Sequence, residues 1–210
     1  LQPDRVSAVA GLSVPYSQRG EMSSIERWKR MYEGKFFYQL YFQEEGVAEA
    51  ELEADVRRSL KKIYYLASGD PTQEDRQALF SKGPASTLLE GIPTPDSFPD
   101  WLSDEDLDYF VDVFTQSGFR GPLNRYRAQQ RDWDLLPQLS DLTVDQPSYF
   151  IAGALDGVRT FIPGVDMYAN PGANCTDFRG ATIIEGEGHW IQQEAPNQVN
   201  HALLGFLADL

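Results

Sequence analysis

Three short stretches of consecutive apolar and small residues predict buried β-strands. They are residues 6–14 (VSAVAGLSV), 148–154 (SYFIAGA) and 181–185 (ATIIE), and glycine, proline or aspartate follows closely after each one. Continuous apolar runs of this kind are typical of strands in a parallel sheet that is covered on both faces. The pattern therefore predicts an α/β fold.

About 130 residues separate the first two predicted strands, whereas a crossover between parallel strands usually needs roughly a dozen. The excess predicts that a small domain is inserted between them. We expect a core strand region over residues 1–15, a helical cap (lid) domain over residues 16–140, and two strands and a final helix of the core over residues 141–210. Residues 83–99, which contain four prolines, are expected to form a long surface loop.

The spacing of apolar residues in the insert is helical. One amphipathic helix is predicted by a stripe at positions i, i+4, i+8 and i+11, which are Leu52, Val56, Leu60 and Ile63. Another helix is expected to begin after Ser103, where Asp106 completes a capping box, and to end before Gly118. Its buried stripe is predicted to be Leu107, Phe110, Val111 and Phe114. Residues 24–32 and 123–133 are expected to form two further helices.

The two ends of the chain are also expected to be helical. A C-terminal helix is predicted from about Pro196, with His201 on its solvent-facing side. Its apolar stripe is predicted to be Val199, Leu203, Phe206, Leu207 and Leu210. Residues 1–5 are interpreted as the tail of a helix that leads into the first strand.

The charge and cysteine content exclude several classes of function. The formal net charge is −14, and the chain has one cysteine, Cys175. Nucleic acids and anionic membranes need clustered basic residues, so neither is an expected partner. Cys175 is interpreted as a structural thiol, because alone it forms neither a disulfide framework nor a thiolate metal site. No run of about 18 apolar residues is present, and we expect a cytoplasmic protein without a metal or cofactor.

Two polar residues follow the second and third predicted strands, where open parallel sheets bind their ligands. Asp156 comes after the second strand and His189 after the third. An aspartate at such a place is often a turn former, and a single histidine is often a structural hydrogen-bonding group. Their order, however, is that of the acid and the histidine in the triad of α/β-hydrolases. The other histidine, His201, lies on a solvent face, so a histidine-dependent mechanism would use His189.

The first member of such a triad, the nucleophile, has no candidate in these residues. A nucleophile elbow is a sharp strand-to-helix turn with closely spaced glycines, and no segment has this pattern. We expect the elbow to precede Leu1.

Several segments resemble the soluble epoxide hydrolases of the α/β-hydrolase superfamily. Residues 36–52 (FFYQLYFQEEGVAEAEL) and 117–127 (SGFRGPLNRYR) are similar to the lid signatures of that family. Residues 188–196 (GHWIQQEAP) are similar to its histidine segment, and residues 1–16 to the stretch after its nucleophile helix. The resemblance spans nearly the whole chain and implies the C-terminal half of an α/β-hydrolase fold with an inserted helical cap.

The resemblance also implies the roles of individual residues. Tyr38 and Tyr126 match the two lid tyrosines that hold the epoxide oxygen, and Asp156 and His189 match the acid and the histidine. Gln39 and Trp190 are candidate substrate-binding residues, although Gln39 could instead cap a helix and Trp190 could simply pack beside His189. The family nucleophile is an aspartate in a Gly-His-Asp-Trp-Gly elbow, and its oxyanion donors follow a His-Gly-Phe-Pro loop. Both are expected in the N-terminal half of the enzyme.

The resemblance predicts hydrolysis of a small hydrophobic epoxide to a vicinal diol through an alkyl-enzyme ester. Two alternatives remain open at this point. A dehalogenase of the same fold would use the same aspartate and histidine but would need no tyrosine pair. A non-catalytic binding fragment or paralogue would use only the lid pocket. The sequence does not determine the oligomeric state, and a homodimer is one of the possible assemblies.

Overall fold

The computed structural model describes residues 2–96 and 101–210. The chain divides into two compact units, each described by itself below. The sheet unit consists of Leu1–Gln18, Ala67–Asp70 and Asp141–Leu210, and the helical unit consists of Arg19–Leu66 and Pro71–Ser140. The predicted domain boundaries at residues 16 and 140 stay a prediction, and the domain and loop predictions for residues 1 and 97–100 lie outside the described residues.

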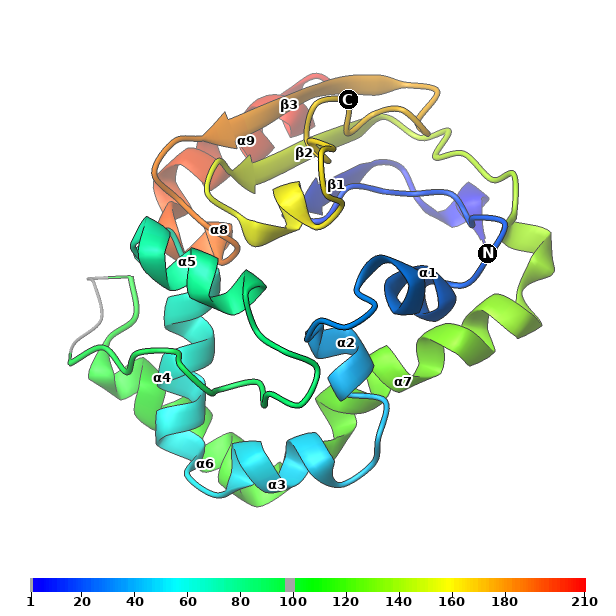
Figure 1. Ribbon diagram of the computed structural model, residues 1–210. Coiled ribbons are helices and arrows are strands. Elements are labelled where there is room, and N and C mark those ends of the chain that lie inside the picture. Colours follow the sequence, from blue (N-terminus) through cyan, green and yellow to red (C-terminus); the bar gives the residue numbers. More distant parts are fainter. Residues whose placement is uncertain (1, 97–100) are drawn as a thin grey trace. The chain divides into compact units, whose positions relative to one another are not determined.

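The sheet unit contains the three predicted strands, β1 (Val9–Leu12), β2 (Ser148–Gly153) and β3 (Phe178–Ile184). They are parallel and lie side by side in the order β1-β2-β3 (Figure 1). The prediction of parallel strands is confirmed, although β1 is shorter and β3 begins earlier than the apolar runs indicate. Because all three strands run the same way, their carboxyl ends meet at one edge of the sheet.

Alternate residues of β2 point to opposite faces of the sheet, as the two-residue period of a strand requires. Ile151 packs in one cluster with Ile184, Ile191 and Val199, and Phe150 packs in another cluster with Tyr168. Both faces of the strand are therefore buried. This explains why its sequence is a continuous apolar run rather than an alternating one.

Two helices follow β3, namely α8 (Ile191–Glu194) and α9 (Pro196–Ala208). The C-terminal helix was predicted to bury a stripe of five residues. Val199 and Phe206 are buried, whereas Leu207 and Leu210 are each 56% exposed. The prediction is wrong for these last two leucines. Leu207 directly follows the buried Phe206 and so points to another side of the helix, and Leu210 lies beyond the end of the helix at Ala208.

The helical unit contains seven described helices. They are α1 (Ser24–Met31), α2 (Tyr38–Tyr41), α3 (Val47–Glu53), α4 (Val56–Ala67), α5 (Gln73–Phe80), α6 (Asp104–Ser117) and α7 (Arg120–Leu135). The helical unit also contains the short 3-10 helix η2 (Pro137–Leu139), and the sheet unit contains two others, η1 (Pro3–Arg5) and η3 (Gly157–Thr160). In the segment predicted to be the tail of a helix, Pro3–Arg5 forms a single 3-10 turn, so that prediction is wrong for the described residues 2–5. Residues 83–96 form a loop, as predicted, but the prediction that it lies on the surface is wrong for Leu88, Leu89 and Ile92. These three side chains are buried, and the first two pack in the core cluster of the helical unit.

The stripe predicted as one helix, Leu52 to Ile63, lies on two. Helix α3 ends at Glu53 and α4 begins at Val56, and the carboxylate of Asp55 accepts a hydrogen bond from the backbone N–H of Arg58 at 3.0 Å. Asp55 therefore caps the first turn of α4 and breaks the helix. The buried face persists across the break, because Leu52 and Leu60 belong to one core cluster.

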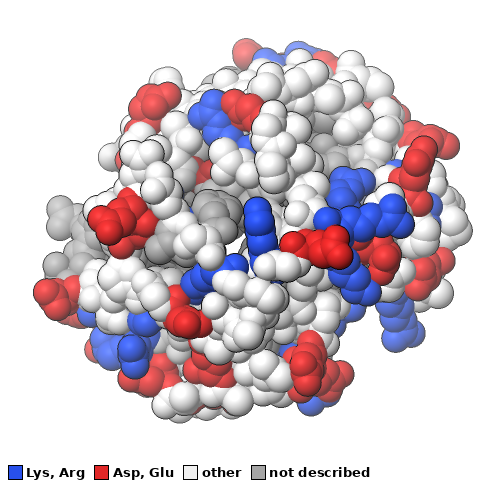
Figure 2. Space-filling model, viewed as in Figure 1, with Lys and Arg blue, Asp and Glu red and all other residues white. Residues whose placement is uncertain are grey.

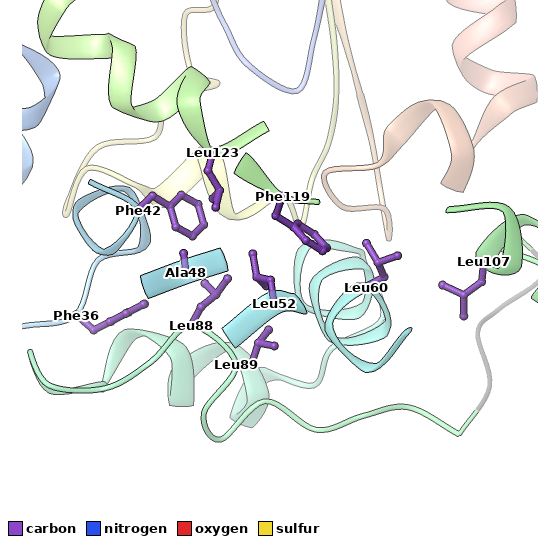
Figure 3. Packing of buried hydrophobic residues seen from close by; sticks show 10 residues of the cluster. All are labelled: Phe36, Phe42, Ala48, Leu52, Leu60, Leu88, Leu89, Leu107, Phe119 and Leu123. Carbon is purple, nitrogen blue, oxygen red and sulfur yellow. The ribbon is translucent and has the colours of Figure 1, made fainter. Parts of the chain in front are cut away.

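The predicted capping of α6 is confirmed. The Ser103 hydroxyl accepts a hydrogen bond from the backbone N–H of Asp106, and the Asp106 carboxylate accepts one from the backbone N–H of Ser103. The helix buries Leu107 completely and ends at Ser117, and its C-cap residue Gly118 has a φ of +67°. Figure 3 shows the core cluster to which Leu107 belongs. This cluster fixes the segments that carry the candidate tyrosines, because Phe42 and Leu123 are members of it.

Charged side chains of both signs are interspersed on the face shown in Figure 2. On that face, the basic side chains therefore do not form one continuous surface. Within residues 2–96 and 101–210, no helix combines the length and the apolar character that crossing a membrane would need.

Candidate active site

The carboxyl ends of the strands bring together Asp156, which follows β2, and His189, which follows β3. The His189 Nδ1 atom lies 2.9 Å from Asp156 Oδ2. The aspartate side chain is 1% exposed and the histidine side chain is 30% exposed. The predicted acid and histidine are therefore hydrogen-bonded partners, and the carboxylate is inaccessible while part of the imidazole is open.

Asp156 combines the two roles that its sequence position suggested. Its Oδ1 atom accepts the backbone N–H of Val158 at 2.8 Å and so caps η3. Its Oδ2 atom accepts from His189 and also from the hydroxyl of Tyr168, at 2.7 Å. The turn-forming bond orients the carboxylate, which in turn orients the imidazole.

The hydrogen bond to Asp156 defines the chemistry of His189. Because an ionised carboxylate can only accept, Nδ1 carries a proton and Nε2 is the nitrogen that can take one up. The ring of Trp190 packs against the imidazole at a centroid distance of 5.1 Å and an angle of 75°. Trp190 thus lies beside His189, and its predicted contact with substrate stays a prediction.

The backbone around His189 is held on both sides. The His189 N–H donates to the Ala67 carbonyl at 2.8 Å, and the His189 carbonyl accepts from the Ser13 hydroxyl at 2.7 Å. Gly188 has no room for a side chain, because a Cβ atom there would lie 2.2 Å from the carbonyl carbon of Ser68. The absence of a side chain at Gly188 therefore allows the loop to pass close to the backbone of Ala67–Asp70.

Glu194, in α8, is a residue that the sequence did not single out. Its carboxylate accepts hydrogen bonds from the backbone N–H groups of Gly69, Gly188 and Trp190 at 2.7, 2.8 and 2.8 Å. Two of these donors flank His189 directly. Burial raises the pKa of Glu194, whereas the three N–H donors lower it. Glu194 therefore fixes the loop that presents the imidazole.

Ser13 is a second residue that the sequence did not single out. It immediately follows β1, is 4% exposed, and has a φ of +62°. It is the one non-glycine residue with positive φ in the part of the chain that the structure describes. Such a conformation costs roughly 1–3 kcal/mol and is frequent near functional sites. Here it allows the Ser13 hydroxyl to reach His189 and the Ser13 carbonyl to reach Tyr168.

Tyr38 and Tyr126 come together in the helical unit. Tyr38 is the first residue of α2 and Tyr126 lies in α7, and their rings meet edge to face at a centroid distance of 5.8 Å and an angle of 81°. Phe42 contacts both rings, at centroid distances of 5.4 and 5.1 Å. Among the described residues, the Tyr126 hydroxyl has no hydrogen-bond partner.

A chain of hydrogen bonds orients the hydroxyl of Tyr38. The indole N–H of Trp28 donates to Gln39 Oε1 at 3.0 Å, and Gln39 Nε2 donates to the Tyr38 hydroxyl at 2.9 Å. An indole N–H can only donate, so it fixes the orientation of the Gln39 amide. Since the Tyr38 oxygen accepts from Gln39, its own O–H proton takes no part in this hydrogen bond. Gln39 thus contacts Tyr38, and its predicted role in substrate binding stays a prediction.

Arg127 fixes the position of Tyr126, its neighbour in α7. Its guanidinium donates to both carboxylate oxygens of Glu49 at 2.6 and 2.9 Å, and its Nε donates to the Phe42 carbonyl at 2.7 Å. The Arg127 guanidinium lowers the pKa of Glu49 to about 2. This fork-like ion pair ties α7 to α3, and the bond to the Phe42 carbonyl ties α7 to the end of α2, the helix that carries Tyr38.

The two pairs have complementary chemical capacities. Phenols with a reference pKa near 10 stay protonated at neutral pH and can donate to a developing alkoxide. An imidazole oriented by a buried carboxylate can act as a general base toward water. Within residues 2–96 and 101–210 no group of three or more His, Cys, Asp and Glu side chains is arranged to hold a metal ion.

Comparison with known proteins identifies the family. The chain is 37% identical over 213 residues to "Epoxide hydrolase A" of Mycobacterium tuberculosis, covering 100% of the chain and 64% of the relative. It is 31% identical over 241 residues to "Epoxide hydrolase B" of the same organism, covering 67% of the relative. The solved "Epoxide hydrolase from an endophytic Streptomyces" superposes with a TM-score of 0.89 at 41% identity, over 99% of the chain and 62% of that structure.

These similarities hold along almost the entire chain, but the chain spans about 64% of the length of the relatives it matches. No protein-family model matches it. The parallel sheet, the inserted helices and the identities of 31% and above agree on one assignment. The chain belongs to the epoxide hydrolases of the α/β-hydrolase superfamily and corresponds to their helical cap and the C-terminal part of their core.

Proposed function

We propose that the protein carrying this chain opens an epoxide with water to a vicinal diol through an alkyl-enzyme ester. The observation that carries the proposal is the meeting of Tyr38 and Tyr126 at a centroid distance of 5.8 Å. A pair of neutral O–H donors suits an epoxide oxygen, which becomes an alkoxide when the ring opens. Halide release would not need such a pair, so the proposal favours epoxide hydrolysis over dehalogenation.

In the first step, a carboxylate attacks one epoxide carbon and the bond between that carbon and the ring oxygen breaks. A new ester bond forms, and the electron pair of the broken bond goes to the oxygen. The hydroxyls of Tyr38 and Tyr126 donate hydrogen bonds to that oxygen, and a phenol proton neutralises it. Positioned acid catalysis of this kind contributes about 10²- to 10⁴-fold in rate.

In the second step, His189 Nε2 takes a proton from water as the water oxygen attacks the ester carbonyl. The ester bond breaks, the second proton of the water passes to the leaving alkoxide, the diol leaves, and the carboxylate is restored. Asp156 stabilises the imidazolium that forms, because its carboxylate accepts the Nδ1 proton at 2.9 Å. The proton then returns from His189 to restore the tyrosine phenol, which balances the cycle.

The proposal includes parts of the enzyme outside these 210 residues. A nucleophilic aspartate and the oxyanion donors would come from an N-terminal portion of the same protein. The substrate is proposed to be a small hydrophobic epoxide, because apolar and aromatic side chains surround the tyrosine pair, with Phe42 in contact with both rings. A cytoplasmic location and a homodimeric assembly belong to the same proposal, and fractionation and light scattering test them.

The direct experiment expresses the protein together with its upstream sequence and measures diol formation from styrene oxide. Asp156→Asn should reduce turnover about 10²- to 10⁴-fold, because an amide cannot replace the carboxylate as partner of the imidazolium. Asp177→Asn, which removes an exposed carboxylate paired with Arg179, is the matched control and should keep full activity.

The outcome of this experiment separates the alternatives. Loss of diol formation in Asp156→Asn alone supports the proposal. Release of halide from a haloalkane without diol formation would reassign the protein as a dehalogenase. Specific epoxide binding without turnover, together with an upstream sequence that lacks an aspartate elbow, would make it a binding protein.

A further inference from the structure

The Asp156 carboxylate has a second side-chain partner besides His189. The hydroxyl of Tyr168 lies 2.7 Å from Asp156 Oδ2, the same oxygen that lies 2.9 Å from His189 Nδ1. Two donors thus share one carboxylate oxygen. A change in either bond must change the charge that this oxygen presents to the other donor.

Tyr168 is held rigidly. It is 5% exposed, its ring packs against Phe150 at a centroid distance of 5.1 Å and an angle of 64°, and its backbone N–H donates to Asp166 at 2.9 Å. Burial raises the pKa of the Tyr168 phenol, and the neighbouring Asp156 carboxylate raises it further. The phenol therefore stays protonated and acts toward Asp156 only as a donor.

The single proton of this hydroxyl has two acceptors. The Ser13 carbonyl lies 2.5 Å from the Tyr168 oxygen, and Asp156 Oδ2 lies 2.7 Å from it. Ser13 also donates its own hydroxyl proton to the His189 carbonyl at 2.7 Å. Tyr168, Ser13, His189 and Asp156 therefore form a closed circuit of hydrogen bonds. Because Ser13, Asp156 and His189 follow β1, β2 and β3, this circuit links the carboxyl ends of the three strands.

We propose that Tyr168 is a positioning residue for the hydrolytic step: its hydroxyl fixes Asp156 Oδ2 and withdraws charge from it, which sets how strongly His189 holds a proton. The inference rests on the proposed function, in which His189 must take a proton from water and release it in each turnover. An unmoderated carboxylate would hold the imidazolium too firmly for rapid release. The Tyr168 hydroxyl that moderates this charge is not part of the nucleophile–acid–histidine triad.

Other charged groups face this circuit. Arg159 and Asp166 pair with each other at 2.7 Å beside Tyr168, and Glu194 holds the loop around His189. Glu187 lies in that loop, and its backbone carbonyl accepts a hydrogen bond from the Leu155 N–H. In the part of the chain that the structure describes, none of these side chains donates a hydrogen bond to Asp156 Oδ2, the oxygen that accepts from His189. The Tyr168 hydroxyl is therefore the group to alter.

The test uses Tyr168→Phe, which keeps the ring and removes only the hydroxyl. Two quantities are measured in the protein that carries the chain: the pH–rate profile of diol formation and the NMR resonance of the His189 Nδ1 proton. The acidic limb of the profile should move up by about one pH unit, because a carboxylate oxygen with one donor fewer holds the imidazolium more firmly. For the same reason, the Nδ1 proton should resonate at lower field.

Tyr149→Phe is the matched control. It removes a half-buried hydroxyl of the same unit, which is bonded to Thr182 at 2.9 Å, and should change neither quantity. If Tyr168→Phe destabilises the protein, 3-fluorotyrosine at position 168 provides a second test, because its more acidic hydroxyl donates more strongly. It should move both quantities in the opposite direction.

Each outcome has one meaning. Unchanged values in a folded Tyr168→Phe protein would overturn the inference. A shifted resonance with an unchanged pH–rate profile would also overturn it, because Tyr168 would then affect the imidazole without affecting the reaction. If the wild-type protein forms no diol, the proposed function fails, and the resonance alone decides whether the Tyr168 hydroxyl sets the charge on Asp156.

Discussion

Tyr38 and Tyr126 meet edge to face with their ring centroids 5.8 Å apart. Gln39 and Trp28 orient the first hydroxyl, and the ion pair of Arg127 with Glu49 fixes the helix of the second. Two segments far apart in the sequence thus present two phenols at one place in the helical unit.

The double variant Tyr38→Phe with Tyr126→Phe should slow epoxide opening by about 10²- to 10⁴-fold, because no phenol is left to protonate the alkoxide. Each single variant should lose less, since one donor remains. The measurement is the rate of styrene oxide consumption in a single turnover. Tyr109→Phe, at a side chain that is 66% exposed on α6, serves as the control. Wild-type ring opening in the double variant would exclude the assigned role.

The Glu49–Arg127 pair should make stability depend on pH in the acidic range. The pKa of Glu49 is lowered from 4.5 to about 2 by the hydrogen bond to Arg127. A carboxyl with a lowered folded-state pKa contributes its stability fully above the unfolded value, and loses it as the pH falls toward the folded value. The free energy of unfolding should therefore decrease between about pH 4.5 and pH 2 by more in the wild type than in Glu49→Gln.

Urea unfolding at several pH values measures this difference. Glu45→Gln is the control, because the Glu45–Arg120 pair is exposed, with side-chain exposures of 61% and 66%, and contributes little. Equal pH dependence in wild type and Glu49→Gln would contradict the prediction.

Substitutions at Ser13 should separate strain from hydrogen bonding. Ser13→Ala and Ser13→Gly both remove the hydrogen bond to the His189 carbonyl, which is worth about 1 kcal/mol. Only glycine adopts the φ of +62° without strain. The glycine variant should therefore be more stable than the alanine variant by roughly 1 kcal/mol in chemical unfolding. The reverse order would show that Ser13 is not strained.

Glu194→Gln should weaken both the fold and the site. An amide retains one acceptor oxygen but turns an NH₂ group toward a backbone N–H, so at least one of the bonds to Gly69, Gly188 and Trp190 is lost. The expected loss of stability is about 1–3 kcal/mol, with slower diol formation because the His189 loop is released. Glu185→Gln, at an exposed position, is the comparison. An unchanged melting temperature and an unchanged rate of diol formation would show that Glu194 does not hold the His189 loop.

Local rules predicted the elements whose causes are local. The capping box at Ser103 depends on two residues three positions apart, and the buried strand β2 on one apolar run, so both could be recognised from the sequence. The break between α3 and α4 was missed, because the apolar stripe continues through it and only the side chain of Asp55 interrupts the helix. The exposure of Leu207 was missed because periodicity does not show where a neighbouring surface ends.

The same distinction applies to the site. Asp156 and His189 could be predicted because parallel strands place their ends together. Ser13 could not, since it lies within an apolar run and its positive φ has no sequence signature. Tyr168 and Glu194 act through contacts that depend on the path of loops, and no spacing rule predicts those paths.

A single turnover of styrene oxide by the His189→Asn variant, followed by mass spectrometry of the intact protein, tests directly whether the reaction passes through an alkyl-enzyme ester that His189 hydrolyses. Ring opening needs the tyrosines but not the imidazole, so the epoxide should be consumed and the protein should gain the mass of one substrate molecule. Diol formation should fall by about 10³-fold or more, because no base activates water. Diol formation at the wild-type rate, with no adduct on the protein, would show that His189 is not the base and that no alkyl-enzyme ester forms.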